Sequence, residues 1–223
     1  MRIFHPMSRM IACAGLALVF ATAAFAVVAA AQTQGSCPPI IASLLPKNAS
    51  IRDGQYMAVP ADSADKIGNG SGSADIPFEH QCIKSNKFPA RISIKVTYFG
   101  GEAVWQLQMG GDAFNEEAMS GAMRELEQRK RTLNNAMSEP KRERLAGGEI
   151  VYADFKSECP PKENVMADVG EMIVPNVKLR GVISTDNARL EVKLEGQISV
   201  ELAKAAVTEV FENLKKADFA KVK

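Results

Sequence analysis

The residues in this sequence best suited to chemistry are His80 and Cys82, which are separated by a single residue. Side chains two positions apart in a strand point to the same face, so this imidazole and this thiolate could reach one metal ion or one proton. Glu79 or Glu158 could add a carboxylate. A zinc site takes three or four ligands, however, and the pattern supplies too few. We therefore favour a disulfide cysteine beside a histidine of an edge strand, with no metal.

A second candidate is the pair Met119 and Met123, which places two thioethers on one face of a predicted helix. Soft copper ions prefer such ligands, but methionine also fills gaps in apolar cores, and we favour the core role. Acidic residues within 102–117 occupy turns and a helix start, where acids stabilise structure without catalysis. His80 is the only histidine after residue 31, so no Ser-His-Asp arrangement can be assembled. We expect no catalytic residues and no cofactor, and hence a non-enzymatic protein.

Residues 1–31 have the composition of an export signal. Arg2 and Arg9 precede an apolar, alanine-rich run, and the alanines at 29–31 suit a small-residue cleavage site. An uncleaved anchor is the alternative, because the run is close to the ~20 residues that span a bilayer. We predict a periplasmic or secreted protein, which meets a membrane only if this segment is retained.

The charge balance bears on the class of partner. The chain has 27 basic and 26 acidic residues, and residues 1–31 contribute two of the basic residues and none of the acidic ones. The remainder therefore carries 25 basic and 26 acidic residues, a net charge of −1. This balance gives no general attraction to nucleic acid. Residues 32–223 are long enough for one domain with an apolar core.

Three cysteines follow the signal segment: Cys37, Cys82 and Cys159. Export makes disulfides plausible, and an odd number leaves at least one thiol free or paired between chains. Sequence alone leaves all three pairings open. We favour 37–82, since it would hold the N-terminal segment in place, whereas the internal repeat described next favours 82–159.

The clearest structural pattern runs from Val177 to Leu214. Apolar residues alternate on both sides of a turn at Asp186-Asn187, which predicts a β-hairpin. Ser199 then begins a helix with an apolar stripe that includes Val207 and Phe211.

An earlier stretch repeats this order. Apolar residues alternate over 92–98 and 105–109 around Gly100-Gly101, and Asn115 begins a helix. The match predicts an internal duplication, strand-strand-strand-helix used twice, in units 74–140 and 147–223.

Two further segments complete the predicted organisation. Segment 32–73 is predicted to hold a short helix between prolines, a strand over 51–59 interrupted at Asp53-Gly54, and a Gly/Ser loop that covers 60–75. Residues 141–144 are predicted to be a charged linker between the units.

Antiparallel strands with one apolar face need a covering layer. We predict an α+β fold, a two-layer sandwich of an antiparallel sheet of roughly six to eight strands with both main helices on one face. The opposite face should be solvated, because its predicted residues are polar: Lys95, Thr97, Gln106, Gln108, Lys193 and Glu195.

The solvated face favours a protein-interaction or envelope-assembly module, whose partner is another envelope protein or a second copy of the chain. The alternative is a carrier or sensor of a small apolar ligand held between sheet and helices. The residues predicted to line that ligand site are Trp105, Met119, Met123, Val207 and Phe211.

Overall fold

The computed structural model describes six stretches of the chain: 37–57, 65–77, 90–133, 137–154, 177–196 and 198–219. Every described residue belongs to one unit of the chain, Gln32–Lys223. The predicted signal segment lies outside the described residues, and so do His80, Cys82 and Cys159. The predictions made for them stay predictions.

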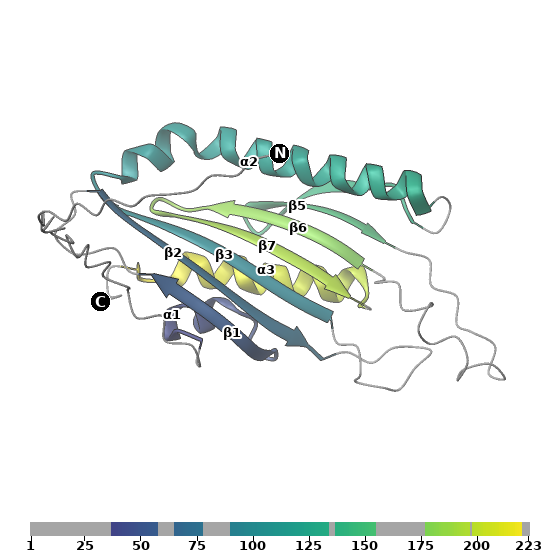
Figure 1. The fold of residues 1–223 in the computed structure, drawn as a ribbon, viewed down its shortest axis with the longest axis horizontal. Coiled ribbons are helices and arrows are strands. Elements are labelled where there is room, and N and C mark those ends of the chain that lie inside the picture. The colour runs from purple at the N-terminus through teal and green to yellow at the C-terminus, as the bar shows by residue number, and fades with distance from the viewer. Residues whose placement is uncertain are drawn as a thin grey trace, which may run out of the picture. The chain divides into compact units, whose positions relative to one another are not determined.

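In the described part of the chain, seven strands form one antiparallel sheet in the order β1-β2-β3-β7-β6-β5-β4 (Figure 1). The strands are β1 (Ser50–Met57), β2 (Asp65–Ile76), β3 (Ala90–Gly101), β4 (Lys141–Leu145), β5 (Gly148–Asp154), β6 (Val177–Ser184) and β7 (Ala188–Gly196). The helices are α1 (Pro39–Leu44), α2 (Val104–Leu133) and α3 (Val200–Lys216). The predicted α+β sandwich built on an antiparallel sheet is confirmed.

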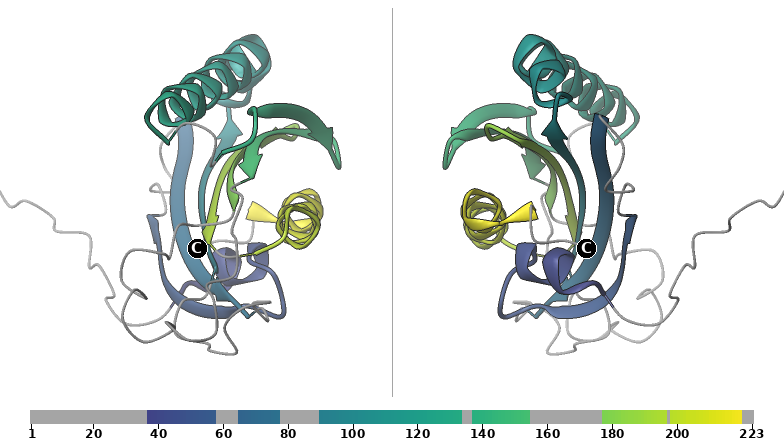
Figure 2. Two further views of the ribbon diagram at one scale, coloured as in Figure 1. Left: turned by 90° about the vertical axis from the view of Figure 1, so that its right-hand side faces the viewer. Right: turned by 90° about the vertical axis from the view of Figure 1, so that its left-hand side faces the viewer.

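The two main helices lie on opposite faces of the sheet, which corrects the expectation that both cover one face. Helices α1 and α3 pack on the face that carries Leu179 and Leu190, here called the inner face. Helix α2 packs on the other, outer face against Val151 and Val182. Figure 2 shows the sheet curving around α1 and α3, with α2 against its other side. The sheet is therefore covered on both faces where α2 crosses it.

The C-terminal hairpin and helix confirm the strongest sequence pattern. Strands β6 and β7 pair around the turn at Asp186-Asn187. The Ser199 hydroxyl caps α3 by accepting a hydrogen bond of 3.2 Å from the N–H of Leu202. One apolar stripe of α3 is buried against the inner face: Ala203, Ala206, Val207, Val210, Phe211 and Leu214.

The predicted Gly/Ser loop is wrong over 65–75, where the chain forms strand β2. Two of its glycines face the inner side of the sheet, beneath α1. A Cβ atom at Gly70 would lie 2.4 Å from Cδ1 of Ile41, and one at Gly72 would lie 2.6 Å from Cγ2 of the same residue. The glycines therefore leave the space into which α1 docks.

The predicted first hairpin is also wrong, because Trp105, Leu107 and Met109 belong to helix α2 rather than to a strand. Buried positions recur every fourth residue at Ala103, Leu107 and Gly111, which is the spacing of a helical face. The positions matched to 105–109 in the second unit form strand β7. The internal duplication is therefore not confirmed.

The two edges of the sheet also differ from expectation. Residues 141–144, predicted as a charged linker, belong to edge strand β4, and the charged side chains of this strand discourage pairing with another sheet. Asp53-Gly54, predicted as a turn, lies inside edge strand β1, where the register shifts between Ile51 and Asp53.

Candidate binding surface on the outer face of the sheet

The residues predicted to line an apolar ligand site do not surround one space. Val207 and Phe211 are fully buried in the core beneath α3. Met119 and Met123 belong to the smaller cluster beneath α2, on the other side of the sheet. Trp105 is more than half exposed on α2. The sheet therefore lies between the residues on α2 and those on α3 that were expected to line one ligand site.

No group of three or more His, Cys, Asp or Glu side chains within the described ranges is placed to hold a metal ion. Cys37 is a free thiol, half-buried against Gly54, and the structure forms no disulfide at this position. Burial raises the pKa of the Cys37 thiol, and the nearby carboxylate of Asp53 adds to that rise. The thiol is therefore a weak nucleophile at neutral pH.

The outer face of β1, β2 and β3 is open, because α2 lies mainly over β5 and β6 (Figure 1). Four of the residues predicted to be solvated, Lys95, Thr97, Lys193 and Glu195, share this face, since they alternate with buried residues of β3 and β7. The other two, Gln106 and Gln108, lie in α2.

Three adjoining hollows cross this open face, with volumes of about 810, 360 and 430 Å³. The first and second share Lys95 and Glu191, and the second and third share Thr97 and Arg189. Together they form one trough along β3 and β7, which we call the outer furrow. Its course depends on the pairing of β3 with β7, two strands far apart in sequence.

One end of the outer furrow is cationic. The largest hollow is lined by five basic residues (Arg52, Arg91, Lys95, Arg180 and Lys193) and by only two acidic ones (Asp53 and Glu191). At its border Glu195 forms ion pairs with three cations, at distances of 3.5 Å to Lys178, 3.0 Å to Arg180 and 3.3 Å to Lys193. Burial alone would raise the pKa of Glu195, but these cations outweigh burial and lower it. Glu195 is therefore a charged anchor for the surrounding cations.

The other end of the furrow is apolar. Trp105, Met109 and Phe114 of α2 are each more than half exposed there. Arg189 holds this end in place, since its Nη2 donates a hydrogen bond of 3.1 Å to the carbonyl oxygen of Phe114. Its guanidinium carbon also lies 5.4 Å from the centre of the Phe114 ring, a cation–π distance.

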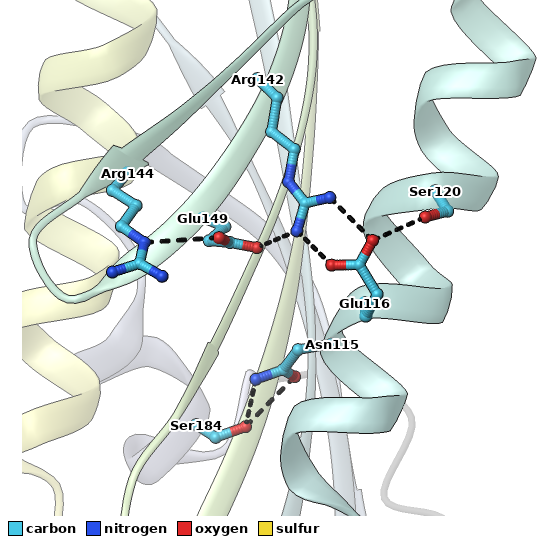
Figure 3. A network of polar contacts seen from close by, with 7 residues as sticks. All are labelled: Asn115, Glu116, Ser120, Arg142, Arg144, Glu149 and Ser184. Atoms are coloured by element: carbon cyan, nitrogen blue, oxygen red, sulfur yellow. Dashed lines mark hydrogen bonds and ion pairs between the residues drawn. The ribbon is translucent and has the colours of Figure 1, made fainter.

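A polar network fixes α2 beside the furrow (Figure 3). Arg142 of β4 donates two hydrogen bonds to the Glu116 carboxylate, of 2.9 and 2.5 Å, and a third of 2.6 Å to Glu149. The side chain of the preceding residue, Asn115, donates a 3.0 Å hydrogen bond to the hydroxyl of Ser184 in β6. In the first half of α2 these charged and polar contacts add to the buried side chain of Leu107, whereas the later turns are attached by the apolar cluster.

Acid should loosen this attachment. Hydrogen bonds from Arg142 and Ser120 lower the pKa of Glu116 to about 2, from an ordinary value of 4.5. A lowered carboxyl pKa contributes stability that is fully present above the unfolded value, here 4.5, and is lost as pH falls through about 2. We expect Glu116→Gln to raise amide exchange of residues 104–116 at neutral pH, as measured by hydrogen–deuterium exchange.

Glu117→Gln is the matched control, since Glu117 is an exposed neighbour on the same helix turn. It should leave amide exchange in 104–116 unchanged. The emission of Trp105, the only tryptophan of the chain, provides a second readout of the same segment. Equal exchange in the two variants would show that the Arg142–Glu116 pair does not hold α2.

Comparison of the chain with protein-family models, curated proteins and solved structures found no match. Among the helices that the structure describes, none combines the length and apolar character needed to cross a membrane. The fold and the surface thus describe an α+β protein with one open, furrowed sheet face.

Sequence reasoning found the polar part of this surface and missed its apolar end. The sequence pattern places Trp105 in an interior ligand site, and it gives no prediction for Phe99 and Phe114, which also line that end. The sequence signal for this apolar end is the four-residue spacing of Ala103, Leu107 and Gly111. This spacing is typical of one helical face, and a helix over 104–111 places Trp105 and Met109 on its exposed side.

Proposed function

We propose that the chain is an exported, non-enzymatic protein that binds another envelope protein through the outer furrow. The observation that carries the proposal is the open outer face itself, which is polar, furrowed and bordered by exposed aromatic residues. Protein interfaces commonly combine a few aromatic anchors with a polar, solvated rim. Export is proposed from the composition of residues 1–31.

The furrow favours this function over the carrier of a small apolar ligand. The residues expected to surround such a ligand are divided between two separate clusters and the surface. The furrow is lined largely by polar and charged side chains, and enclosed sites for apolar ligands are mostly apolar.

A bulky substitution within the furrow tests the proposal. Ser93 lies between Ser73 of β2 and Lys193 of β7, so an indole at this position would fill the largest hollow. We expect Ser93→Trp to abolish co-purification of a protein that accompanies the wild-type chain from the producing cells. Ala205→Trp, on the exposed side of α3, should retain that protein.

Circular dichroism and thermal unfolding would establish that both variants keep the fold. Loss of the partner from Ser93→Trp alone supports binding in the furrow. Retention by Ser93→Trp, or loss from both variants, would place the partner elsewhere and contradict the proposal.

A further inference from the structure

We infer that the outer furrow binds an extended, acidic segment of polypeptide with a large apolar side chain at one end. This inference rests on the proposed function and adds the chemistry of the partner. Four features of the furrow carry it: its length, its positive charge, the polar side chains of its middle and the apolar character of one end.

The length of the furrow matches a short extended peptide. The trough follows β3 from Arg91, which lines the cationic end, to Phe99, which lines the apolar end. At roughly 3.3 Å per residue, this part of β3 spans about 26 Å. A bound segment of about eight extended residues would therefore reach both ends.

The charge presented to a ligand is positive, although the furrow also contains acidic residues. The side chains of Arg52, Arg91 and Lys193 are 52%, 55% and 53% exposed. The carboxylates that pair with them, Asp75 and Glu195, are only 15% and 28% exposed. The cations thus project toward solvent above covered anions, where the guanidinium groups can form paired hydrogen bonds with incoming carboxylates.

The middle of the furrow suits a peptide backbone. Four uncharged polar side chains line it, those of Gln55, Asn69, Ser71 and Thr97, together with the charged side chains of Lys95, Arg189 and Glu191. Such amides and hydroxyls can both donate to carbonyl groups and accept from N–H groups. The Thr97 hydroxyl donates a 3.0 Å hydrogen bond to Asn69 across β2 and β3, so these two side chains lie within reach of one ligand group.

The apolar end gives the segment an anchor and a direction. Its hollow of about 430 Å³ is lined by Phe99, Trp105, Leu107, Met109 and Phe114. A large apolar side chain placed there would contact several aromatic rings. Polypeptide is the polymer that joins carboxylates, neutral backbone amides and such a side chain in one strand, so we place it here in preference to nucleic acid.

Selection from a displayed library of random twelve-residue peptides, with the purified protein as target, tests this inference. We expect enriched peptides to carry clustered Asp or Glu toward one end and Trp, Phe, Leu or Met toward the other. The most enriched peptide would then be labelled, and its affinity measured by fluorescence anisotropy and by the emission of Trp105.

Variants of the two ends identify the site. The double substitution Lys95→Glu/Lys193→Glu should weaken binding roughly tenfold or more, with greater loss at low salt. Trp105→Ala should weaken it roughly tenfold at the anchor. Lys215→Glu/Lys216→Glu, which makes the same charge change on exposed residues of α3, should leave the affinity unchanged.

The inference would be overturned if no peptide were enriched, or if the enriched peptides lacked acidic residues. It would also be overturned if acidic peptides bound the Lys95→Glu/Lys193→Glu variant with unchanged affinity. The fourth contrary outcome is a single-stranded thymidine oligonucleotide that binds in the furrow as tightly as the peptide. None of these affects the co-purification result. If Ser93→Trp loses the co-purified partner but the enriched peptides are not acidic, the proposed function stands and only the acidic character of the partner is refuted.

Discussion

Replacing Phe211 with alanine is expected to lower the free energy of unfolding by about 3–5 kcal/mol. The Phe211 ring is fully buried and lies over two glycines of the inner face. A Cβ atom at Gly148 would lie 2.6 Å from the ring, and one at Gly181 would lie 3.0 Å from it. Because the backbone of β5 and β6 forms the floor of this site, the sheet cannot collapse into the cavity that alanine leaves. Urea denaturation at equilibrium measures the change.

Leu202→Ala is the matched control, because Leu202 lies on the same helix with its side chain more than half exposed. Its effect should stay within about 0.5 kcal/mol. A near-neutral Phe211→Ala would mean that α3 does not dock on the inner face.

The double substitution Gly70→Ala/Gly72→Ala is expected to destabilise the protein by about 2–4 kcal/mol, because each added methyl overpacks the site. Both methyl groups would enter the space occupied by Ile41 of α1, and the one at Gly70 would also lie 2.8 Å from the Tyr56 ring. In a loop, the same substitutions at compatible positions would stabilise by about 0.4–1 kcal/mol each, through the lower entropy of the unfolded chain. The sign of the effect thus distinguishes strand β2 under α1 from the Gly/Ser loop that composition predicts.

Ser71→Ala provides the comparison, since Ser71 lies between the two glycines and faces the outer furrow. Its effect should remain within about 0.5 kcal/mol in the same denaturation experiment. In a mutant cycle, Gly70→Ala/Gly72→Ala combined with Ile41→Ala should destabilise the protein by less than the sum of the two separate effects, because the smaller side chain at position 41 makes room for the added methyl groups. A stabilised Gly70→Ala/Gly72→Ala would contradict the docking of α1 on β2.

Where sequence reasoning succeeded, local pattern and tertiary environment agreed. The hairpin and helix of 177–214 combine an alternating strand over 188–195, a turn dipeptide and a cap at Ser199, and each is present in the structure. Polar residues on alternate positions of β3 and β7 likewise identified the open face.

The sequence-based predictions failed where one local pattern is compatible with two structures. Alternating glycine and serine are typical of a flexible loop, but also of a strand against which a helix packs closely. Gly70 and Gly72 are of the second kind, because they leave space for Ile41 of α1. Alternation over 105–109 suited a strand, yet the stripe through Leu107 and Gly111 suits a helix equally. Long-range packing decided both cases.

The sequence contains one signal for helices on both faces of the sheet. Residues 150–153, Ile-Val-Tyr-Ala, are apolar without alternation, and all four are buried. A strand of this type has both faces covered. The pairing of β3 with β7, which creates the outer furrow, has no comparable local signal, because the two strands are about 100 residues apart in sequence.

A photo-crosslinking comparison tests the central claim, that the outer furrow is the binding surface, most directly. The photoreactive residue p-benzoylphenylalanine would replace Thr97, in the middle of the furrow, or Ala205, on the exposed side of α3, in cells that produce the protein. The predicted result is a discrete covalent adduct of higher mass from position 97 and none from position 205. An adduct from position 205 alone, or from neither position, would contradict a partner site in the furrow.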